Sequence, residues 1–310
     1  LAGLGIGSSA GAFLARFIAN PRAALGWCQL LLVLALGWAA WSLTAALPYW
    51  PINPSLSTAP AYTFQIDIIR ALWVVLPGAL LWGASFPLGL AALASKDDDP
   101  ARLVGVAYAA NTLGAIVGSL VTSLLLIGTI GTQNTQRVLI ALAAISALLT
   151  LALLVGEHGR LKLAPRGLLA GGGAALLGLW VISTVGTIPP LLVGYGRFMA
   201  YRMNAHGDFI FVGEGTNSTV AVSQLENGVR NYHNAGKVQA SSEPQDMRLQ
   251  RMLGHFTTLL SPKPSEVLVI GFGAGVTAGA VSIDPMVQRI TVAELEPLVP
   301  KVAGEYFRES

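Results

Sequence analysis

The sequence is poor in charge, and this scarcity sets its class. Asp, Glu, Lys and Arg make up only 11% of the 310 residues, against about 25% in soluble globular domains. Hydrophobic residues reach 53%, and the mean hydropathy is +0.61. Long uncharged stretches fill residues 1–195, whereas the remainder has ordinary polarity. This pattern predicts a membrane region followed by a soluble module.

Cysteine and a strong net charge are missing as well. Cys28 is the only cysteine and lies in an apolar stretch, which excludes an internal disulfide framework and a thiolate metal site. The formal net charge of +3 is too small and too scattered to indicate nucleic-acid binding. Asp208, Glu214 and Glu226 have no metal-like spacing, so we expect them to face solvent and no metal to bind.

Six apolar segments are long enough, or nearly so, to cross a bilayer, which takes about 20 helical residues. They are Leu1–Ile18, Ala24–Leu47, Ala71–Ala94, Leu103–Ile127, Val138–Val155 and Leu168–Thr187. No ionisable residue lies deep in them, which weakens a proton- or ion-coupled transporter. Gly114 and Gly118 form a small-xxx-small face that we predict to pack against a neighbouring helix, with Asn111 as a polar contact within the bundle.

Short alternating runs replace the long apolar segments after about residue 207. Four of them predict an antiparallel β-meander: Phe209–Val212, Thr219–Gln224, Val229–His233 and Lys237–Ala240. Asn227-Gly228 is a strong two-residue hairpin turn. His233 is expected on the surface of this meander. An amphipathic helix over about Pro244–Leu260 follows.

The stretch Glu266–Glu296 has the pattern of a nucleotide-binding βαβ unit. Val267–Ile270 is a short aliphatic run, typical of a buried parallel strand. A glycine turn follows, then a helix to about Ile283 and a second apolar run, Ile290–Ala293. The start of a Rossmann-like sheet is therefore predicted here.

Three glycines, Gly271, Gly273 and Gly275, form the turn and let a ligand approach the backbone closely. A dinucleotide fingerprint would need another glycine at Val276. The G-x-G-x-G spacing is instead associated with sites for S-adenosylmethionine and its relatives. Glu294, which ends the second run, can accept hydrogen bonds from two ribose hydroxyls. The stretch therefore predicts a nucleoside-binding site.

Several motifs together resemble a known family. The meander ending in GKVQ, the helix closing on MLGH, and the runs VLVIGFGAG and VAELE are similar to spermidine synthase and related aminopropyltransferases. The apolar stretches ASFPL and YAANTLGAIVGSL resemble the membrane-embedded bacterial branch of that family. The resemblance covers nearly the whole chain. It implies an inner-membrane enzyme that transfers an aminopropyl group from decarboxylated S-adenosylmethionine to a small-molecule amine.

The resemblance also implies cosubstrate-binding roles for individual residues. They are Gly271, Gly273, Gly275, Gln239, Asp246, Gln250 and Glu294. The sequence departs from the family at Ala274, where an acid that holds the aminopropyl amine is expected, and at Leu249, where a tyrosine is expected. The catalytic aspartate of the family would lie beyond Ser310, so no catalytic residue is assigned and we expect the sequence to be a fragment.

The predicted organisation has three parts. Residues 1–195 form a multi-pass helical membrane region with about six spans, residues 196–243 the meander, and residues 244–310 an incomplete Rossmann-like domain. The lipid bilayer is the expected partner, and assembly of several copies stays open. Two other functions also stay open: a methyltransferase-like enzyme using ordinary S-adenosylmethionine, and a non-enzymatic transporter-like protein with a nucleoside-binding domain.

Basic loop residues should set the orientation of the spans. Arg16, Lys96 and Arg160 lie in alternate loops, which predicts that these loops are cytoplasmic. Six spans would then place the soluble module outside, whereas adenosylmethionine-type cosubstrates are cytosolic. We therefore expect a re-entrant segment or two short passes within Leu168–Tyr195, and a cytoplasmic soluble module.

Overall fold

The computed structural model describes residues 1–47, 50, 59–94, 99–155, 161–163, 165–203 and 207–308. Contacts divide the chain into two compact units. The first unit is Leu1–Thr187 and the second unit is Ile188–Ser310. The first is built mainly from helices, and the second contains a four-stranded antiparallel sheet and a two-stranded parallel sheet.

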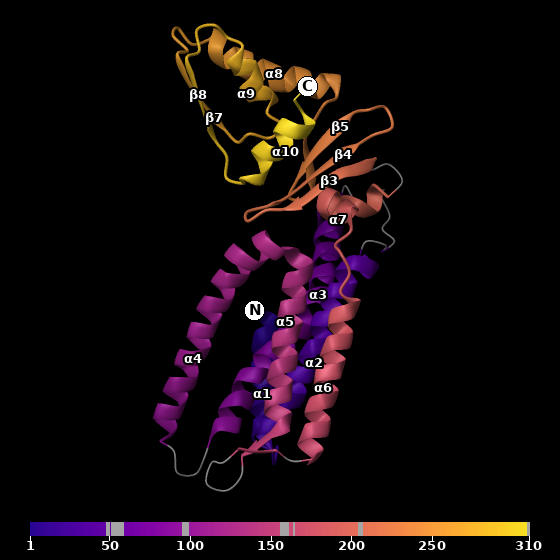
Figure 1. The fold of residues 1–310 in the computed structure, drawn as a ribbon, viewed down its shortest axis with the longest axis vertical. Coiled ribbons are helices and arrows are strands. Elements are labelled where there is room, and N and C mark those ends of the chain that lie inside the picture. The colour runs from indigo at the N-terminus through magenta and orange to yellow at the C-terminus, as the bar shows by residue number, and fades with distance from the viewer. Residues whose placement is uncertain are drawn as a thin grey trace. The chain divides into compact units, whose positions relative to one another are not determined.

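The helices of the first unit alternate in direction along the chain (Figure 1). Their bounds are α1 Ala2–Ala15, α2 Pro21–Trp41, η1 Ser42–Ala46, α3 Pro60–Leu93, α4 Pro100–Leu120, η4 Val121–Leu126, α5 Ile127–Ala152 and α6 Pro165–Thr184, with a short hairpin of β1 Leu153–Val155 and β2 Leu161–Leu163 before α6. Proline begins four of these helices, where its missing N–H costs nothing. The side chains of Asn20 and Asp99 accept N–H groups at the starts of α2 and α4.

Among the described residues, four helical stretches are long and apolar enough to cross a membrane. They are Pro21–Ala46, Pro60–Leu93, Ala101–Ala152 and Gly167–Thr184. By length and composition the chain therefore fits a membrane protein. The first predicted span corresponds to α1, which has only 14 residues. The fourth and fifth share the 52-residue stretch, which turns back at Gly131, where φ is 76° and ψ is 168°.

Close contact between α1 and α3 depends on glycine. Gly3, Gly7 and Gly11 are the buried residues of α1. An ideal Cβ at Gly11 would lie 2.7 Å from backbone atoms of Ala84 in α3, and one at Gly7 would overlap the backbone of Leu80. The two helix backbones therefore approach more closely than larger side chains would allow.

The predicted packing face of α4 is not packed in this structure. An ideal Cβ at Gly114 or Gly118 would meet no described atom within 4 Å, and Asn111 is exposed. Figure 1 shows α4 standing apart from the other helices of the first unit. The prediction was wrong for this helix because periodicity identifies a face without identifying the neighbour.

The second unit begins with short helices and an antiparallel meander. Its elements are α7 Pro190–Tyr195, η6 Gly196–Tyr201, β3 Asp208–Glu214, β4 Thr219–Gln224, β5 Arg230–Asn234, β6 Lys237–Ser241, α8 Pro244–Leu259, β7 Glu266–Ile270, α9 Val276–Ser282, β8 Arg289–Ala293 and α10 Leu298–Tyr306. The meander has the strand order β3-β4-β5-β6. Gly228 in its hairpin turn has φ 84°, a left-handed conformation that suits glycine. The predicted strands are confirmed. The connection at Asn227-Gly228 is longer than the predicted two residues, because β4 ends at Gln224, β5 begins at Arg230 and Leu225 N–H donates to Val229 O.

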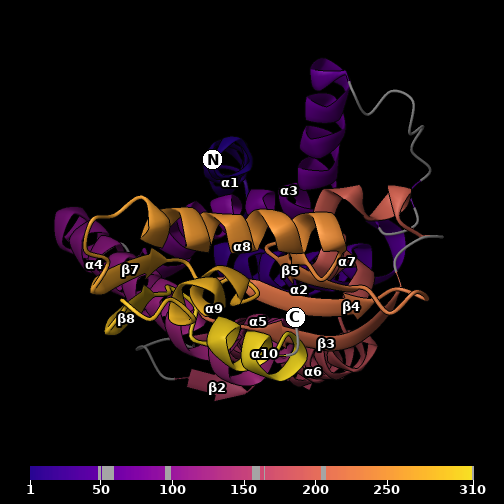
Figure 2. The ribbon, with the colours of Figure 1, turned by 90° about the horizontal axis from the view of Figure 1, so that it is seen from above.

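A parallel pair of strands follows the meander. β7 and β8 pair from Glu266↔Arg289 to Ile270↔Ala293, and α9 connects them. Figure 2 shows α9 between α8 and α10. This gives the βαβ connectivity that the sequence predicts, with a connecting helix of only seven residues.

His233 is buried, contrary to the prediction that it lies on the surface. Its side chain is 0% exposed, its Nε2 lies 2.8 Å from Ser223 Oγ, and its Nδ1 lies 2.9 Å from Gly194 O. Burial lowers the pKa of His233. Gly194 belongs to α7, which packs on the meander, so α7 is part of the second unit rather than a second membrane pass.

Candidate functional site

The glycine turn after β7 has the backbone conformation that only glycine adopts easily. The angle φ is 78° at Gly271, 55° at Gly273 and 83° at Gly275. An ideal Cβ at Gly271 or Gly273 would meet no atom within 4 Å, so the backbone is open to a ligand there. The turn lies at the carboxyl end of a parallel strand, the edge at which such sheets bind ligands.

Gly275 differs from the other two glycines. An ideal Cβ on it would lie 3.1 Å from the ring of Phe272, which belongs to the same turn. Gly275 therefore makes room for a side chain of the protein. The family resemblance assigned all three glycines to the cosubstrate, and the open part of the turn lies at the first two.

Glu294 follows β8 and turns its carboxylate toward the glycine turn. Its Oε2 accepts the Phe272 N–H at 2.7 Å, and its Oε1 accepts the Glu296 N–H at 3.0 Å. The side chain is half-buried. A carboxylate oxygen has two acceptor sites, so each oxygen keeps one for a further donor. The structure brings Glu294 and the turn together.

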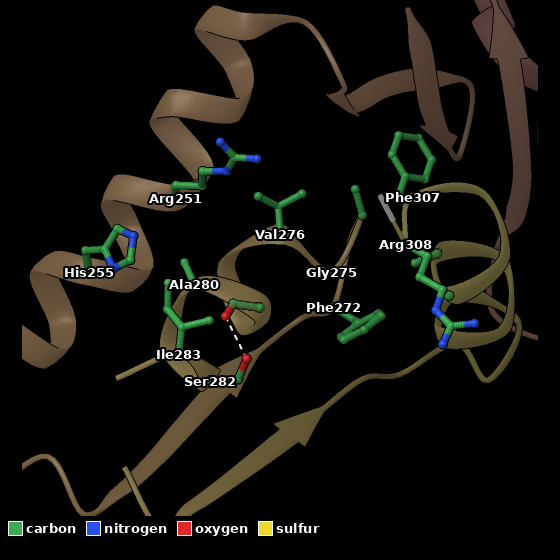
Figure 3. A pocket seen from close by; sticks show the side chains of 14 residues that line it. Arg251, His255, Phe272, Gly275, Val276, Ala280, Ser282, Ile283, Phe307 and Arg308 are labelled. Atoms are coloured by element: carbon green, nitrogen blue, oxygen red, sulfur yellow. Dashed lines mark hydrogen bonds between the residues drawn. The ribbon is translucent and has the colours of Figure 1, made fainter. Parts of the chain in front are cut away.

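A cavity of about 620 Å³ also borders the turn (Figure 3). Arg251 and His255 from α8 line one side of it, and Arg308, just after α10, lines the other. Gly271, Gly273 and Glu294 are not among its lining residues. Phe272, Ala274 and Gly275 of the same turn do line it, so the cavity adjoins the open part of the turn.

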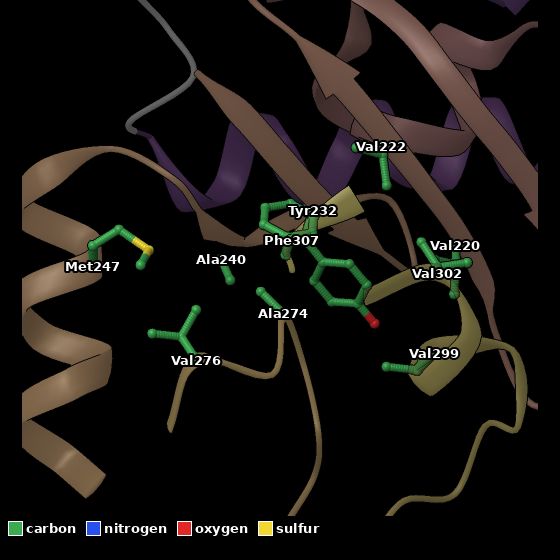
Figure 4. Close-up of a cluster of buried hydrophobic side chains, with 10 residues drawn as sticks. All are labelled: Val220, Val222, Tyr232, Ala240, Met247, Ala274, Val276, Val299, Val302 and Phe307. Atoms are coloured by element: carbon green, nitrogen blue, oxygen red, sulfur yellow. The ribbon is translucent and has the colours of Figure 1, made fainter. Parts of the chain in front are cut away.

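A hydrophobic core holds the turn against the meander (Figure 4). The buried side chains are Val220, Val222, Tyr232, Ala240, Met247, Ala274, Val276, Val299, Val302 and Phe307. Ala274 occupies the position where the family resemblance expects an acid that binds the amine. Its side chain is 4% exposed and packs in this core, so the position offers no acid to an amine.

Glu296 is a buried carboxylate that the sequence analysis missed. It is 4% exposed and accepts the N–H groups of Asn217 at 2.7 Å, Ser218 at 3.2 Å and Leu298 at 3.1 Å. Burial raises its pKa, but these hydrogen bonds outweigh burial, so the pKa of Glu296 is lowered. Its hydrogen bonds connect the turn between β3 and β4 with the start of α10. The two glutamates of VAELE therefore differ: Glu294 contacts the glycine turn, whereas Glu296 does not.

Asp246 and Gln250 close the junction between β6 and α8. Asp246 Oδ2 accepts the Ser241 N–H at 2.6 Å and the Ser241 hydroxyl at 2.8 Å. Gln250 Nε2 donates to the carbonyls of Ser241 and Asp246, both at 3.3 Å. These predicted binding residues therefore have structural partners in this junction, where the chain changes from strand to helix.

Gln239 lies at a bulge in β6 and is exposed. The register steps from Tyr232↔Ala240 to His233↔Val238, which leaves Gln239 without a ladder partner. Ala240 packs in the core beside the turn, whereas Gln239 is exposed. Of the predicted side chains, Glu294 is the one with a hydrogen bond to the turn.

No protein-family model matches the chain, and no curated protein does either. The function must therefore be inferred from the geometry of the turn, Glu294 and the cavity.

Proposed function

We propose that the turn at Gly271 and Gly273, together with Glu294, binds the adenosine part of S-adenosylmethionine or its decarboxylated form. The observation that supports this most directly is the position of Glu294. Its carboxylate is held 2.7 Å from the Phe272 amide nitrogen, beside two glycines whose Cβ positions are empty. A fixed acceptor beside open backbone suits a ribose with two neighbouring hydroxyls.

The residues present fit the nucleoside part of such a cosubstrate. Two backbone N–H groups orient the Glu294 carboxylate before the ligand arrives, which reduces the ordering cost of binding. The remaining acceptor site on each oxygen is free to take a ribose hydroxyl. The sulfonium centre would supply the leaving group of the reaction, and this chain would hold the donor in place.

Following the family resemblance, we propose that the activity is aminopropyl transfer by a membrane-anchored enzyme. An amine nitrogen would attack the carbon next to the sulfonium, the C–S bond would break, and methylthioadenosine would leave. The amine would lose a proton to a base. Alignment of donor and amine accounts for most of the acceleration in such displacements.

Methyl transfer from ordinary S-adenosylmethionine is the second candidate. The burial of Ala274 in the core favours it, because the aminopropyl amine finds no acid at this position. Leu249 is 58% exposed and offers no hydroxyl to an amine substrate. Methyl transfer requires neither contact.

Titration calorimetry of the 310-residue chain in detergent with methylthioadenosine tests the site. Glu294→Gln should weaken binding by about 1–3 kcal/mol, the typical cost of losing a charged hydrogen-bond partner. Glu226→Gln, which changes an exposed glutamate outside the site, is the matched control. Equal affinity of both variants and the unchanged protein would contradict the assignment.

The choice between the two reactions needs a second titration. The affinities for decarboxylated and ordinary S-adenosylmethionine should be compared in the unchanged protein. The products with an amine acceptor should then be analysed with the full-length protein, which is expected to carry the catalytic aspartate. Aminopropylated amine supports the first candidate. Methylated product with no aminopropylation supports the second and would exclude the first.

A further inference from the structure

The cavity between α8, α9 and α10 gathers positive charge without a carboxylate. Arg251 and His255 lie one helical turn apart on α8, and Arg308 enters from the opposite side (Figure 3). No Asp or Glu is among the lining residues. Arg251 and Arg308 have no hydrogen-bond or ion-pair partner in the described part of the chain. Both arginines therefore line the same cavity with their donors unused.

Small residues are among those that line this cavity. Gly279 in α9 and Gly304 in α10 both line it, and an ideal Cβ on either would meet no atom within 4 Å. Neither glycine has a positive φ, so neither is needed for backbone conformation. The volume of about 620 Å³ lies within the range of about 300–1,000 Å³ that is usual for small-molecule sites.

We propose that this cavity binds a phosphoryl group, carried by a small phosphate ester or by a phospholipid headgroup. Arginine presents a planar fork of donors that matches phosphate and carboxylate oxygens. One fork is enough for a planar carboxylate. Two arginines on opposite sides suit a tetrahedral group, which has acceptor oxygens facing both.

The arginines are assigned the main role because His255 has an acidic neighbour. The pKa of Asp284 is lowered first by the Met286 N–H, then by Thr258 and by the charge of His255. Asp284 therefore offsets part of any positive charge on His255. Arg251 and Arg308 have no such neighbour among the residues lining the cavity.

The proposal uses other side chains than the nucleoside site, and the two sites share only the turn residues around Phe272 and Gly275. Glu294, Gly271 and Gly273 do not line the cavity. Glu294→Gln should therefore leave phosphate binding unchanged, and a change at Gly279 should leave Glu294 in place. Failure of one proposal would thus be distinguishable from failure of the other.

The test is calorimetry on the full chain in a phosphate-free detergent with three probes: inorganic phosphate, glycerol 3-phosphate and a short-chain phosphatidylglycerol. We expect saturable binding of at least one probe. Arg251→Gln and Arg308→Gln should each weaken it by about tenfold or more, since charge-assisted bonds to phosphate are lost. Arg248→Gln removes the same charge from an exposed position on α8 outside the cavity and should have little effect.

Gly279→Leu provides a second, independent variant, because Gly279 lines the cavity and an ideal Cβ there meets no atom within 4 Å. It should abolish binding while the unfolding temperature stays near that of the unchanged protein. Binding of both soluble phosphates identifies a free phosphate ester, and binding of phosphatidylglycerol alone identifies a lipid headgroup. No saturable binding of any probe, or binding that survives Gly279→Leu and both arginine variants, would overturn the proposal.

Discussion

Glu296 couples the stability of the second unit to pH at the scale of a single residue. Its hydrogen bonds with backbone N–H groups lower its pKa below the ordinary 4.5. The charged form is therefore favoured in the folded state. Its stabilising contribution should be present above about pH 4.5 and should be lost as pH falls through the lowered folded value.

Glu296→Gln should lower the unfolding free energy of the second unit by about 2 kcal/mol at neutral pH, through the loss of charge-assisted hydrogen bonds. The difference from the unchanged protein should shrink as the pH is lowered toward 3. Urea unfolding at several pH values, followed by hydrogen exchange of residues 208–308, measures both effects. If the exposed-site variant Glu226→Gln showed the same loss of unfolding free energy and the same pH dependence, Glu296 would not be their cause.

His233 should produce a second pH dependence in a different range. Burial lowers its pKa below the ordinary 6.5, so the unfolded chain binds a proton at pH values where the folded chain does not. Stability should therefore fall as pH drops below about 6.5. His233→Gln should flatten this slope between about pH 6.5 and 5, whatever its cost in absolute stability. Glu226→Gln, which changes an exposed residue and keeps His233, serves as the control.

These residues also show where sequence reasoning reaches its limit. Glu294 was identified because a strand end beside a glycine turn is a local feature, visible in VAELE and the run before it. Glu296 binds backbone groups 79 residues away, and His233 binds a carbonyl 39 residues away. Local pattern does not encode such distant partners, so the two were missed.

At the scale of elements, the close contact between α1 and α3 can be tested by two substitutions on α1, one inside the contact and one outside it. Gly7→Leu should force the helices apart, because even a Cβ at Gly7 overlaps the backbone of Leu80. Overpacking of this kind costs about 1–3 kcal/mol or more. Gly5→Leu should change little, since an ideal Cβ at Gly5 meets nothing within 4 Å.

Thermal unfolding of the full chain in detergent, with size-exclusion yield as a check, measures the difference. Gly118→Leu on α4 should behave like Gly5→Leu, within about 0.5 kcal/mol of the unchanged protein. Equal destabilisation by Gly7→Leu and Gly5→Leu would contradict the interface. Destabilisation by Gly118→Leu would instead restore the packing that the sequence predicts for α4.

The outcome for helices and strands has a physical explanation. Glycines four residues apart occur in both α1 and α4, and the motif specifies a face that allows close approach without specifying a partner. The hairpin at Asn227-Gly228 was predictable because its turn requires a positive φ that few residues tolerate. Local backbone demands were therefore foreseen, and the choice of helix neighbours was not.

At the scale of the whole molecule, charge scarcity predicted a membrane region, and the described residues include four helical stretches long and apolar enough to cross a bilayer, followed by a separate unit with strands. The side of the membrane on which the second unit lies can be tested directly. The proposed cosubstrate is cytosolic, so we expect the second unit on the cytoplasmic side. In a Cys28→Ser background, the variant Lys263→Cys should therefore react with an impermeant maleimide only after cells are permeabilised. The test is demanding, because α6 is a single helix and the basic residues before it favour the opposite arrangement. Labelling of intact cells would contradict the adenosylmethionine proposal.

The two units should also unfold separately, since each has its own buried hydrophobic clusters. All seven tryptophans lie in Leu1–Thr187, so tryptophan fluorescence reports on the first unit alone. Lowering the pH from 7 to 4 should destabilise the second unit through His233 and Glu296. The urea midpoint for exchange of residues 208–308 should therefore fall while the tryptophan midpoint stays constant. A joint shift of both midpoints would mean that the units unfold as one. In that case, the tryptophan midpoint would also change in the pH series of Glu296→Gln and His233→Gln.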